Sequence, residues 1–167
     1  MSLLGYVQRT SKANYAVLGQ LPDCDSYRNI KRYSEAKPHK NILIIRFSQG
    51  LFFGNSNVVT DSLNTELKNY TDTKGVIISM PIYTIPDSTV TSQIIQLIKI
   101  CKEKNIRLIF TDLNGPVRDY MHKTNLYREI GASNFHLSIS DAINDIKNKF
   151  EGINKKTIFT EQTNYQK

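Results

Sequence analysis

The sequence predicts an α/β fold, in which helices pack on a β-sheet. Short apolar runs typical of buried strands alternate along the chain with segments of about 10–15 residues whose apolar positions recur at helical spacing. This alternation favours a sheet covered by helices. The chain has 167 residues, of which 40% are hydrophobic and 22% are charged, so one soluble domain with its own core is expected. No apolar run approaches the roughly 20 residues that span a bilayer.

The first two strands flank a long polar connection. Residues Tyr15 to Leu21 alternate with the two-residue period of a strand, and Pro22 ends it because proline cannot donate to a sheet ladder. Ile42 to Phe47 is nearly all apolar, as expected of a central strand buried on both faces. The polar stretch Cys24 to His39 predicts a connection with a short ordered piece around Tyr27 to Tyr33.

A turn, a short strand and a helix are expected next. Ser48-Gln49-Gly50 is a turn signal, and Leu51 to Phe53 predicts a short strand after it. Asn55 or Ser56 is expected to cap a helix, because both side chains can accept from free backbone N–H groups. The apolar residues at helical spacing behind this cap are Val59, Leu63 and Leu67.

The segment Val76 to Cys101 joins a buried strand to an amphipathic helix. Val76 to Tyr83 is a short apolar run that predicts the strand. Asp87 is expected to be the N-cap, since its carboxylate can accept from N–H groups that the first helical turn leaves free. Ser88 would then lie at the mouth of the helix, where a negative charge faces the positive end of the helix dipole. The expected core-facing residues of the helix are Val90, Ile94, Leu97, Ile98 and Cys101.

The last third of the chain predicts another strand and two further helices. Ile106 to Leu113 alternates as a strand, and Asn114-Gly115-Pro116 is a sharp turn with Pro116 suited to a first helical position. The remaining expected elements are a helix to about Lys123 that buries Val117, Tyr120 and Met121, a short turn at Leu126 to Ile130, a strand at Phe135 to Leu137, and a helix opened by Ser140 and Asp141.

One edge of this sheet is the candidate contact surface. The strands that end at Phe47, Tyr83 and Leu113 would open their loops on the same edge, where such sheets usually bind ligands or partners. The carboxylates of Asp112, Asp119 and Asp87 could meet at this edge, but a solvated rim is the preferred interpretation. The candidate contact residues are Ser48, Gln49, Asp87, Ser88, Thr89, Asn114 and Gly115.

The net charge bears on the possible partners of the protein, and the cysteines bear on its cellular compartment. The net charge is +7, and residues 1–40 hold seven Lys or Arg against three Asp or Glu. A basic leading segment can bind nucleic acid, lie against anionic lipid or keep the protein soluble. Solubility is the default because the basic residues are scattered, and no nucleic-acid partner is expected. Cys24 and Cys101 do not make a disulfide framework, which indicates reduced thiols and a cytosolic setting.

No pattern indicates catalysis, a metal or a cofactor. His39, His122 and His136 lie far apart and lack the spacing of metal ligands. Gly50 to Gly54 is not followed by Lys and Ser or Thr, so it is no phosphate-binding loop. A small α/β enzyme would need a nucleophile, a base and oxyanion donors in one pocket, which the sequence does not show.

Several segments together resemble one known family. The stretch Asn14 to Asp25, NYAVLGQLPDCD, and the motif Pro86-Asp87-Ser88-Thr89 are similar, in that order, to the C-terminal STAS domain of SulP-type anion transporters. The resemblance covers roughly Tyr15 to Phe150 and extends through Ile44-Ile45-Arg46-Phe47, Leu51-Phe52-Phe53-Gly54-Asn55, Gly115-Pro116-Val117-Arg118 and Ser140-Asp141-Ala142.

The resemblance implies a STAS-like mixed β-sheet of about four to six strands flanked by about four to five helices. It also implies an organisation in which residues 1–13 are a polar lead-in after a missing membrane domain, 14–150 are the STAS domain and 151–167 are a polar tail. The transporter family moves sulfate, bicarbonate, chloride or related anions, so a series of apolar spans is expected upstream in the gene product.

The resemblance further implies a regulatory or interaction domain that is not an enzyme. It would lie at the cytoplasmic face of a membrane and serve assembly, trafficking or partner control of anion transport. The implied partners are the transmembrane domain of the same polypeptide, a second copy in a homodimer, a cytosolic regulatory protein or kinase, and an anionic lipid surface. No cofactor is expected, and weak nucleotide binding, proposed for family members, has no supporting motif here.

The wider STAS family gives Ser88 a second reading. In bacterial anti-sigma-factor antagonists the serine of an Asp-Ser-Ser/Thr-Gly motif accepts phosphate from a partner kinase, and that role falls on Ser88 here, with Asp87 and Thr89 beside it. The chain departs from that motif in having Val90 where the family often has glycine. The alternative is therefore a free-standing phospho-switch protein that resembles an anti-sigma-factor antagonist.

Overall fold

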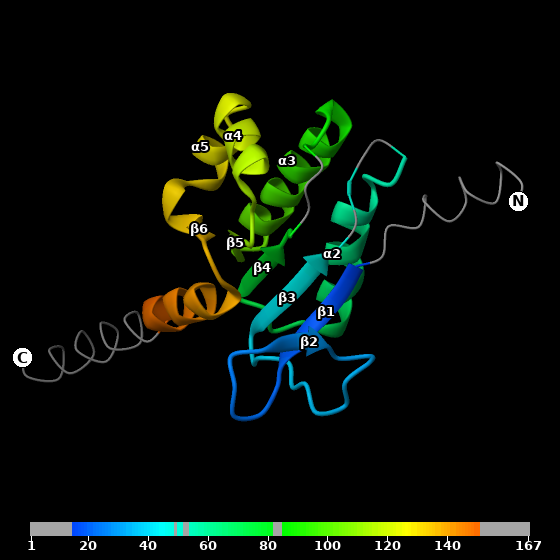
Figure 1. The fold of residues 1–167 in the computed structure, drawn as a ribbon, viewed down its shortest axis with the longest axis vertical. Helices are drawn as coiled ribbons and strands as arrows, with labels where there is room; N and C mark the ends of the chain where they lie inside the picture. The colour runs from blue at the N-terminus through cyan, green and yellow to red at the C-terminus, as the bar shows by residue number, and fades with distance from the viewer. Residues whose placement is uncertain (1–14, 49, 52–53, 82–84, 151–167) are drawn as a thin grey trace, which may run out of the picture.

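Six strands of the described segments form one sheet in the order β2-β1-β3-β4-β5-β6 (Figure 1). The structure is a computed structural model that describes residues 15–48, 50–51, 54–81 and 85–150. The strands are β1 (Tyr15–Gln20), β2 (Tyr27–Asn29), β3 (Ile42–Phe47), β4 (Gly75–Ser79), β5 (Arg107–Thr111) and β6 (Phe135–His136). The predicted lead-in 1–13 and tail 151–167 lie outside the described residues.

The sheet is mixed, as the resemblance implies. β3, β4, β5 and β6 are parallel neighbours. β1 lies between β2 and β3 and runs antiparallel to both. The short ordered piece expected near Tyr27 is thus a strand, because its backbone pairs with β1 from Leu18 to Gln20.

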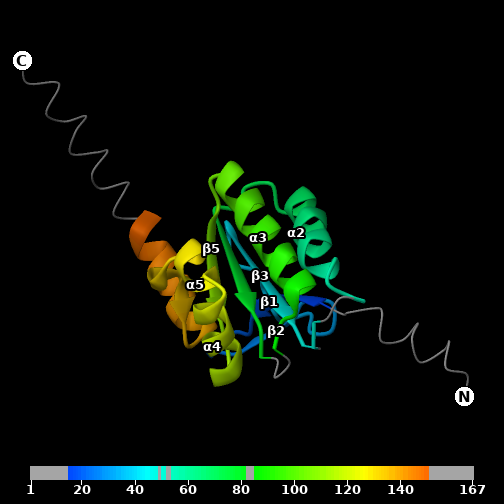
Figure 2. The same ribbon diagram turned by 90° about the horizontal axis from the view of Figure 1, so that it is seen from above.

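Helices cover both faces of the sheet. They are α2 (Val58–Asn69), α3 (Ser88–Glu103), α4 (Gly115–Lys123), α5 (Leu126–Ile130), the 3₁₀ helix η1 (Ala132–Asn134) and a terminal helical segment at 139–150. Figure 2 shows α2 and α3 on one side of the sheet and the terminal helical segment on the other. The five α-helical segments and the six strands of the described residues confirm the predicted α/β fold.

The central strands supply two hydrophobic cores. Successive side chains of a strand point to opposite faces, so Leu43 and Ile45 join the core under α2, α3, α4 and α5. Ile42 and Ile44 join the core under the terminal helical segment. Burial on both faces is the physical reason why β3 reads as a continuous apolar run.

α3 forms where the sequence predicts it. Its buried residues are Val90, Ile94, Leu97, Ile98 and Cys101. Asp87 is its N-cap, and Lys104 follows its last residue. β4 and β5 are shorter than the predicted strands, and β5 stops at Thr111 because Asp112 has a left-handed backbone with φ of 60°.

The start of α2 differs from the prediction. The N-cap is Asn57, and neither Asn55 nor Ser56 takes that place. The carbonyls of Asn55 and Ser56 accept from the N–H groups of Val58 and Val59, which forms a turn ahead of the helix. Leu51 is buried but is not in a strand, and Phe52 and Phe53 lie outside the described residues.

Three smaller predictions in the last third are also wrong. The terminal helix is capped by Ser138, whose Oγ accepts from the backbone N–H of Asp141, so Ser140 and Asp141 lie inside its first turn. Leu137 lies outside β6 and is 80% exposed. Tyr120 is only half-buried, and its hydroxyl lies 2.8 Å from the hydroxyl of Thr91.

Candidate functional site

The carboxyl ends of β3, β4 and β5 meet at one edge of the sheet, which we call the open edge. The strand register aligns Arg46 with Ser79, and Ser79 with Thr111. The segments that follow these strands therefore start side by side, as parallel strands require. They contain all of the predicted contact residues, except that Gln49 lies outside the described residues.

Asp87 fixes the start of α3 at this edge. Its backbone is extended, and its Oδ1 accepts from the backbone N–H groups of Thr89 and Val90 at 2.9 Å each. Two of the N–H groups that the first turn leaves free are thereby satisfied. Val90 is fully buried below them, so the cap is held against the core.

Ser88 and Thr89 are exposed at the mouth of α3. The Ser88 carbonyl accepts from the Ser92 hydroxyl at 3.0 Å, whereas no described group bonds to the Ser88 hydroxyl. A phosphate on Ser88 would face the positive end of a 16-residue helix. The Ser88 side chain therefore lies at the surface of the open edge.

A hydrogen bond links the first turn of α3 to α4. The Thr91 hydroxyl lies 2.8 Å from the Tyr120 hydroxyl and donates to the Asp87 carbonyl at 2.9 Å. Asn114, one of the predicted contact residues, has a structural role in α4. Asn114 is the N-cap of α4, and its Oδ1 accepts from the backbone N–H of Val117 at 3.1 Å.

The predicted contact residues differ in how far their side chains are exposed to solvent. Ser48 is exposed just beyond β3, while Asn114 and Gly115 are half-buried. Ser48, Ser88 and Thr89 therefore offer free side-chain surface at the open edge. Asn114 and Gly115 shape the loop that borders it.

Sequence reasoning missed a polar network at the ends of the parallel strands. Arg46 donates through Nε to the Ser79 hydroxyl at 3.1 Å, and that hydroxyl donates to Oδ2 of Asp112 at 2.5 Å. The Thr111 hydroxyl donates to the same oxygen at 3.1 Å. The side chain of Asp112 is thus a structural acceptor and not part of a solvated rim, whereas Asp119 is exposed as expected.

The network places a charged pair beside the open edge. Ser79 and Thr111 are fully buried, and Arg46 and Asp112 are half-buried. Burial lowers the pKa of the Arg46 guanidinium, and the Asp112 charge opposes that shift. A guanidinium stays protonated in proteins, so Arg46 holds a positive charge close to Ser79. A polar residue at the end of each of two neighbouring apolar strands is the sequence signal that could have indicated this network.

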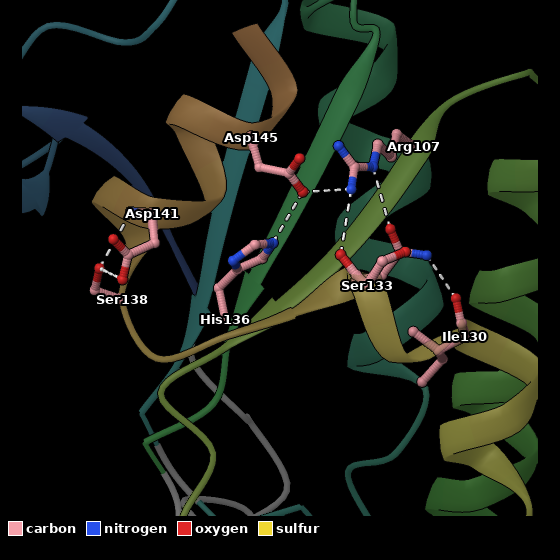
Figure 3. A network of polar contacts seen from close by, with 8 residues as sticks. Arg107, Ile130, Ser133, His136, Ser138, Asp141 and Asp145 are labelled. Atoms are coloured by element: carbon pink, nitrogen blue, oxygen red, sulfur yellow. Dashed lines mark hydrogen bonds and ion pairs between the residues drawn. The ribbon is translucent and has the colours of Figure 1, made fainter. Parts of the chain in front are cut away.

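A second network ties β5 and β6 to the terminal helical segment (Figure 3). Nη2 of Arg107 lies 2.5 Å from Oδ2 of Asp145, and Nε2 of His136 lies 3.0 Å from the same oxygen. Arg107 also donates to the side chain of Asn134 and to the carbonyl of Ser133. The hydrogen bond from Arg107 is the main reason why the pKa of Asp145 lies below its usual value.

Two of the predicted non-ligand histidines contact neighbouring side chains. His122 stacks on Tyr127 with ring centroids 3.8 Å apart, and His136 bonds to Asp145. Among the described residues, no three His, Cys, Asp or Glu side chains lie together in a way that could hold a metal ion. None of the helices in the described segments is both long enough and apolar enough to cross a membrane.

The comparisons with known proteins agree with this geometry. A family model described as STAS domain matches residues 33–142. Sulfate transporter 1.1 of Arabidopsis thaliana is 28% identical over 144 residues, covering 81% of this chain and 22% of that protein. The murine Solute Carrier 26 family member A9 anion transporter has a TM-score of 0.76 at 17% identity, covering 87% of this chain and 24% of that one.

A structure of RsbS from Moorella thermoacetica has a TM-score of 0.54 at 16% identity, covering 68% of this chain and 93% of that one. At this identity the likeness shows the fold alone. The chain spans about a fifth of the length of the curated transporters it matches.

Proposed function

This chain belongs to the STAS domain family, and on that premise we propose that it is the cytoplasmic regulatory and interaction domain of an anion transporter. The family match confirms the resemblance of this sequence to STAS domains. Sulfate is the first anion to test, because sulfate transporters are among the relatives that align with most of this chain. The domain carries no reaction of its own.

The capped start of α3 carries this proposal. Asp87 holds the first turn in place, and the side chains of Ser88 and Thr89 are exposed beside it. Two helices that share the Thr91–Tyr120 hydrogen bond make this part of the open edge a pre-organised surface. Because the cap and the helix–helix hydrogen bond already order these residues, a partner that docks on them avoids part of the entropic cost of ordering them.

Transport measurements on the complete gene product test this role. Ser88→Asp places a charge at the mouth of α3, and Ser88→Ala removes the hydroxyl. We expect sulfate uptake, or the amount of transporter at the membrane, to differ between these two variants. Ser92→Asp is the matched control, since Ser92 is exposed one turn further along α3. Equal uptake and equal membrane amounts for all variants would contradict the proposal.

A free-standing phospho-switch is the second candidate. It is supported by the exposed Ser88 hydroxyl at the positive end of α3 and by the fold likeness to RsbS. Incubation with a lysate of the source cells and ATP, followed by intact-mass measurement, separates the two candidates. Stoichiometric phosphate on Ser88 favours the switch, whereas an unmodified domain together with apolar spans encoded upstream favours the transporter domain.

A further inference from the structure

Four lysines converge at the edge of the sheet opposite the open edge. They line one hollow of about 770 Å³ and come from four different segments. Lys40 precedes β3, Lys74 precedes β4, Lys104 follows α3, and Lys147 belongs to the terminal helical segment. A hollow of this size lies within the range of small-molecule sites.

The backbone holds three of these lysines at neighbouring strand starts. The Asn41 carbonyl accepts from the N–H groups of Lys74 and Gly75, and the Lys74 carbonyl accepts from Arg107. Asn41 and Asn105 both have left-handed backbones, with φ of 62° and 54°. The chain therefore turns sharply beside Lys40 into β3 and beside Lys104 into β5, and β4, which follows Lys74, lies between these two strands.

The positive charge of this hollow is not balanced by its own lining. Among the described residues that line it, Asp72 is the single carboxylate. None of the four lysines forms an ion pair with a carboxylate of the described segments. The four like charges border one hollow, so their potentials add there and attract an anion more strongly than a single lysine does.

The walls of the hollow also include apolar side chains. Ile42 and Ile146 are buried beside the hollow, and Phe150 is half-buried. Burial and the charge of Lys147 lower the pKa of His39, a neighbouring side chain, which is consistent with a positive potential here.

We propose that this hollow binds a soluble anion that carries several phosphate groups. Lysine ammonium groups are compact donors suited to phosphate oxygens, and four of them match several charges better than one. A recessed site favours a free small molecule over a flat lipid surface. The site lies away from Ser88, so it is a second site that does not depend on the role proposed for the open edge.

Calorimetric titration of the domain with inorganic tripolyphosphate tests the proposal. We expect saturable binding that weakens as NaCl is raised. Lys74→Gln with Lys147→Gln should raise Kd about tenfold or more, since each removes a charge-assisted hydrogen bond. Lys123→Gln with Arg128→Gln removes the same charge from exposed positions on α4 and α5 and should change Kd less than about twofold.

Three results would overturn the proposal. They are the absence of saturable binding at millimolar tripolyphosphate, an equal loss in both double variants, and binding only to vesicles that contain phosphatidylserine. Thermal unfolding of each variant shows whether a lost signal comes from lost folding. If both double variants unfold cooperatively at a midpoint temperature close to that of the wild-type protein, the comparison of their Kd values is enough to test the proposal.

Discussion

The Ser79 hydroxyl donates to Oδ2 of Asp112 across a distance of 2.5 Å, and this bond joins β4 to the residue that follows β5. Arg46 at the end of β3 donates to the same hydroxyl. Ser79 thereby connects three parallel strands at the open edge. A hydroxyl that is fully buried and bonded to a guanidinium and a carboxyl group stabilises the native state mainly because its loss leaves both partners unsatisfied.

Ser79→Ala should lower the free energy of unfolding by about 1–3 kcal/mol. Urea denaturation followed by circular dichroism measures the change. Ser92→Ala is the control, because Ser92 is exposed and its loss should cost no more than about 0.5 kcal/mol. Equal stability of the two variants would mean that the Arg46–Ser79–Asp112 network contributes nothing to folding.

Removing the cap of α3 should also destabilise the domain. Asp87→Ala leaves the N–H groups of Thr89 and Val90 without their acceptor, and the expected loss is about 1 kcal/mol. Asp87→Asn should recover most of it, because asparagine is as good an N-cap as aspartate. Asp119→Ala removes an equal charge from an exposed site on α4 and should leave the urea midpoint unchanged.

A side chain at Gly19 would collide with the neighbouring backbone. A Cβ there would lie 2.7 Å from the carbonyl carbon of Lys37 and 2.8 Å from that of Ala36. Gly19→Ala should therefore lower the free energy of unfolding by about 1–3 kcal/mol. Gly115→Ala meets nothing within 4 Å and should leave the thermal midpoint unchanged or slightly higher.

The two thiols should differ sharply in reactivity. Burial raises the pKa of the Cys101 thiol to about 12, while Cys24 is exposed. The thiolate is the reactive form, so one thiol of the native protein should react quickly with Ellman's reagent at pH 8. Both should react in 6 M guanidinium chloride, and Cys24→Ser should abolish the fast phase. Two fast thiols in the native protein would contradict the burial of Cys101.

Acid should weaken the attachment of the terminal helical segment. The pKa of Asp145 lies below its ordinary value of 3.8, mainly because of the hydrogen bond from Arg107. Its stabilising contribution is therefore present above pH 3.8 and is lost as the pH falls through the lower pKa of the folded state.

Asp145→Asn tests this by removing the group that titrates. The variant should be less stable at pH 7, and its stability should depend less on pH below about pH 4 than that of the unchanged protein. Acid titration followed by circular dichroism, with Asp119→Asn as the control, measures both effects. An unchanged acid transition would mean that the Arg107–Asp145 pair does not support folding.

The sequence predicts those helices and strands that are determined by residues close together in the chain. The apolar spacing of α3 and the carboxylate of Asp87 are sufficient to place that helix and its cap. The start of α2 could not be placed as well, because Asn55, Ser56 and Asn57 are all good capping residues. The structure places Asn55 ahead of the helix, where its side-chain amide donates to the Gly50 carbonyl at 3.1 Å.

The sequence shows polar residues at the ends of apolar strands, but not which of them bond to one another, because the members of each network are distant in sequence. Arg46, Ser79 and Asp112 come together only through the register of three parallel strands. Each residue alone reads as an exception in an apolar run or as an exposed acid. The roles of Ser48, Ser88, Thr89, Asn114 and Gly115 as contact residues stay predictions, although the structure places them after the strands that the sequence predicts.

Both outer strands of the sheet are very short. β2 has three residues and β6 has two, so each exposes few unpaired backbone groups to another chain. A second copy would gain little by extending the sheet from either side. If two copies associate, we expect helical surfaces and loops to form the contact, and a dimer of this kind would dissociate without breaking any strand pairing.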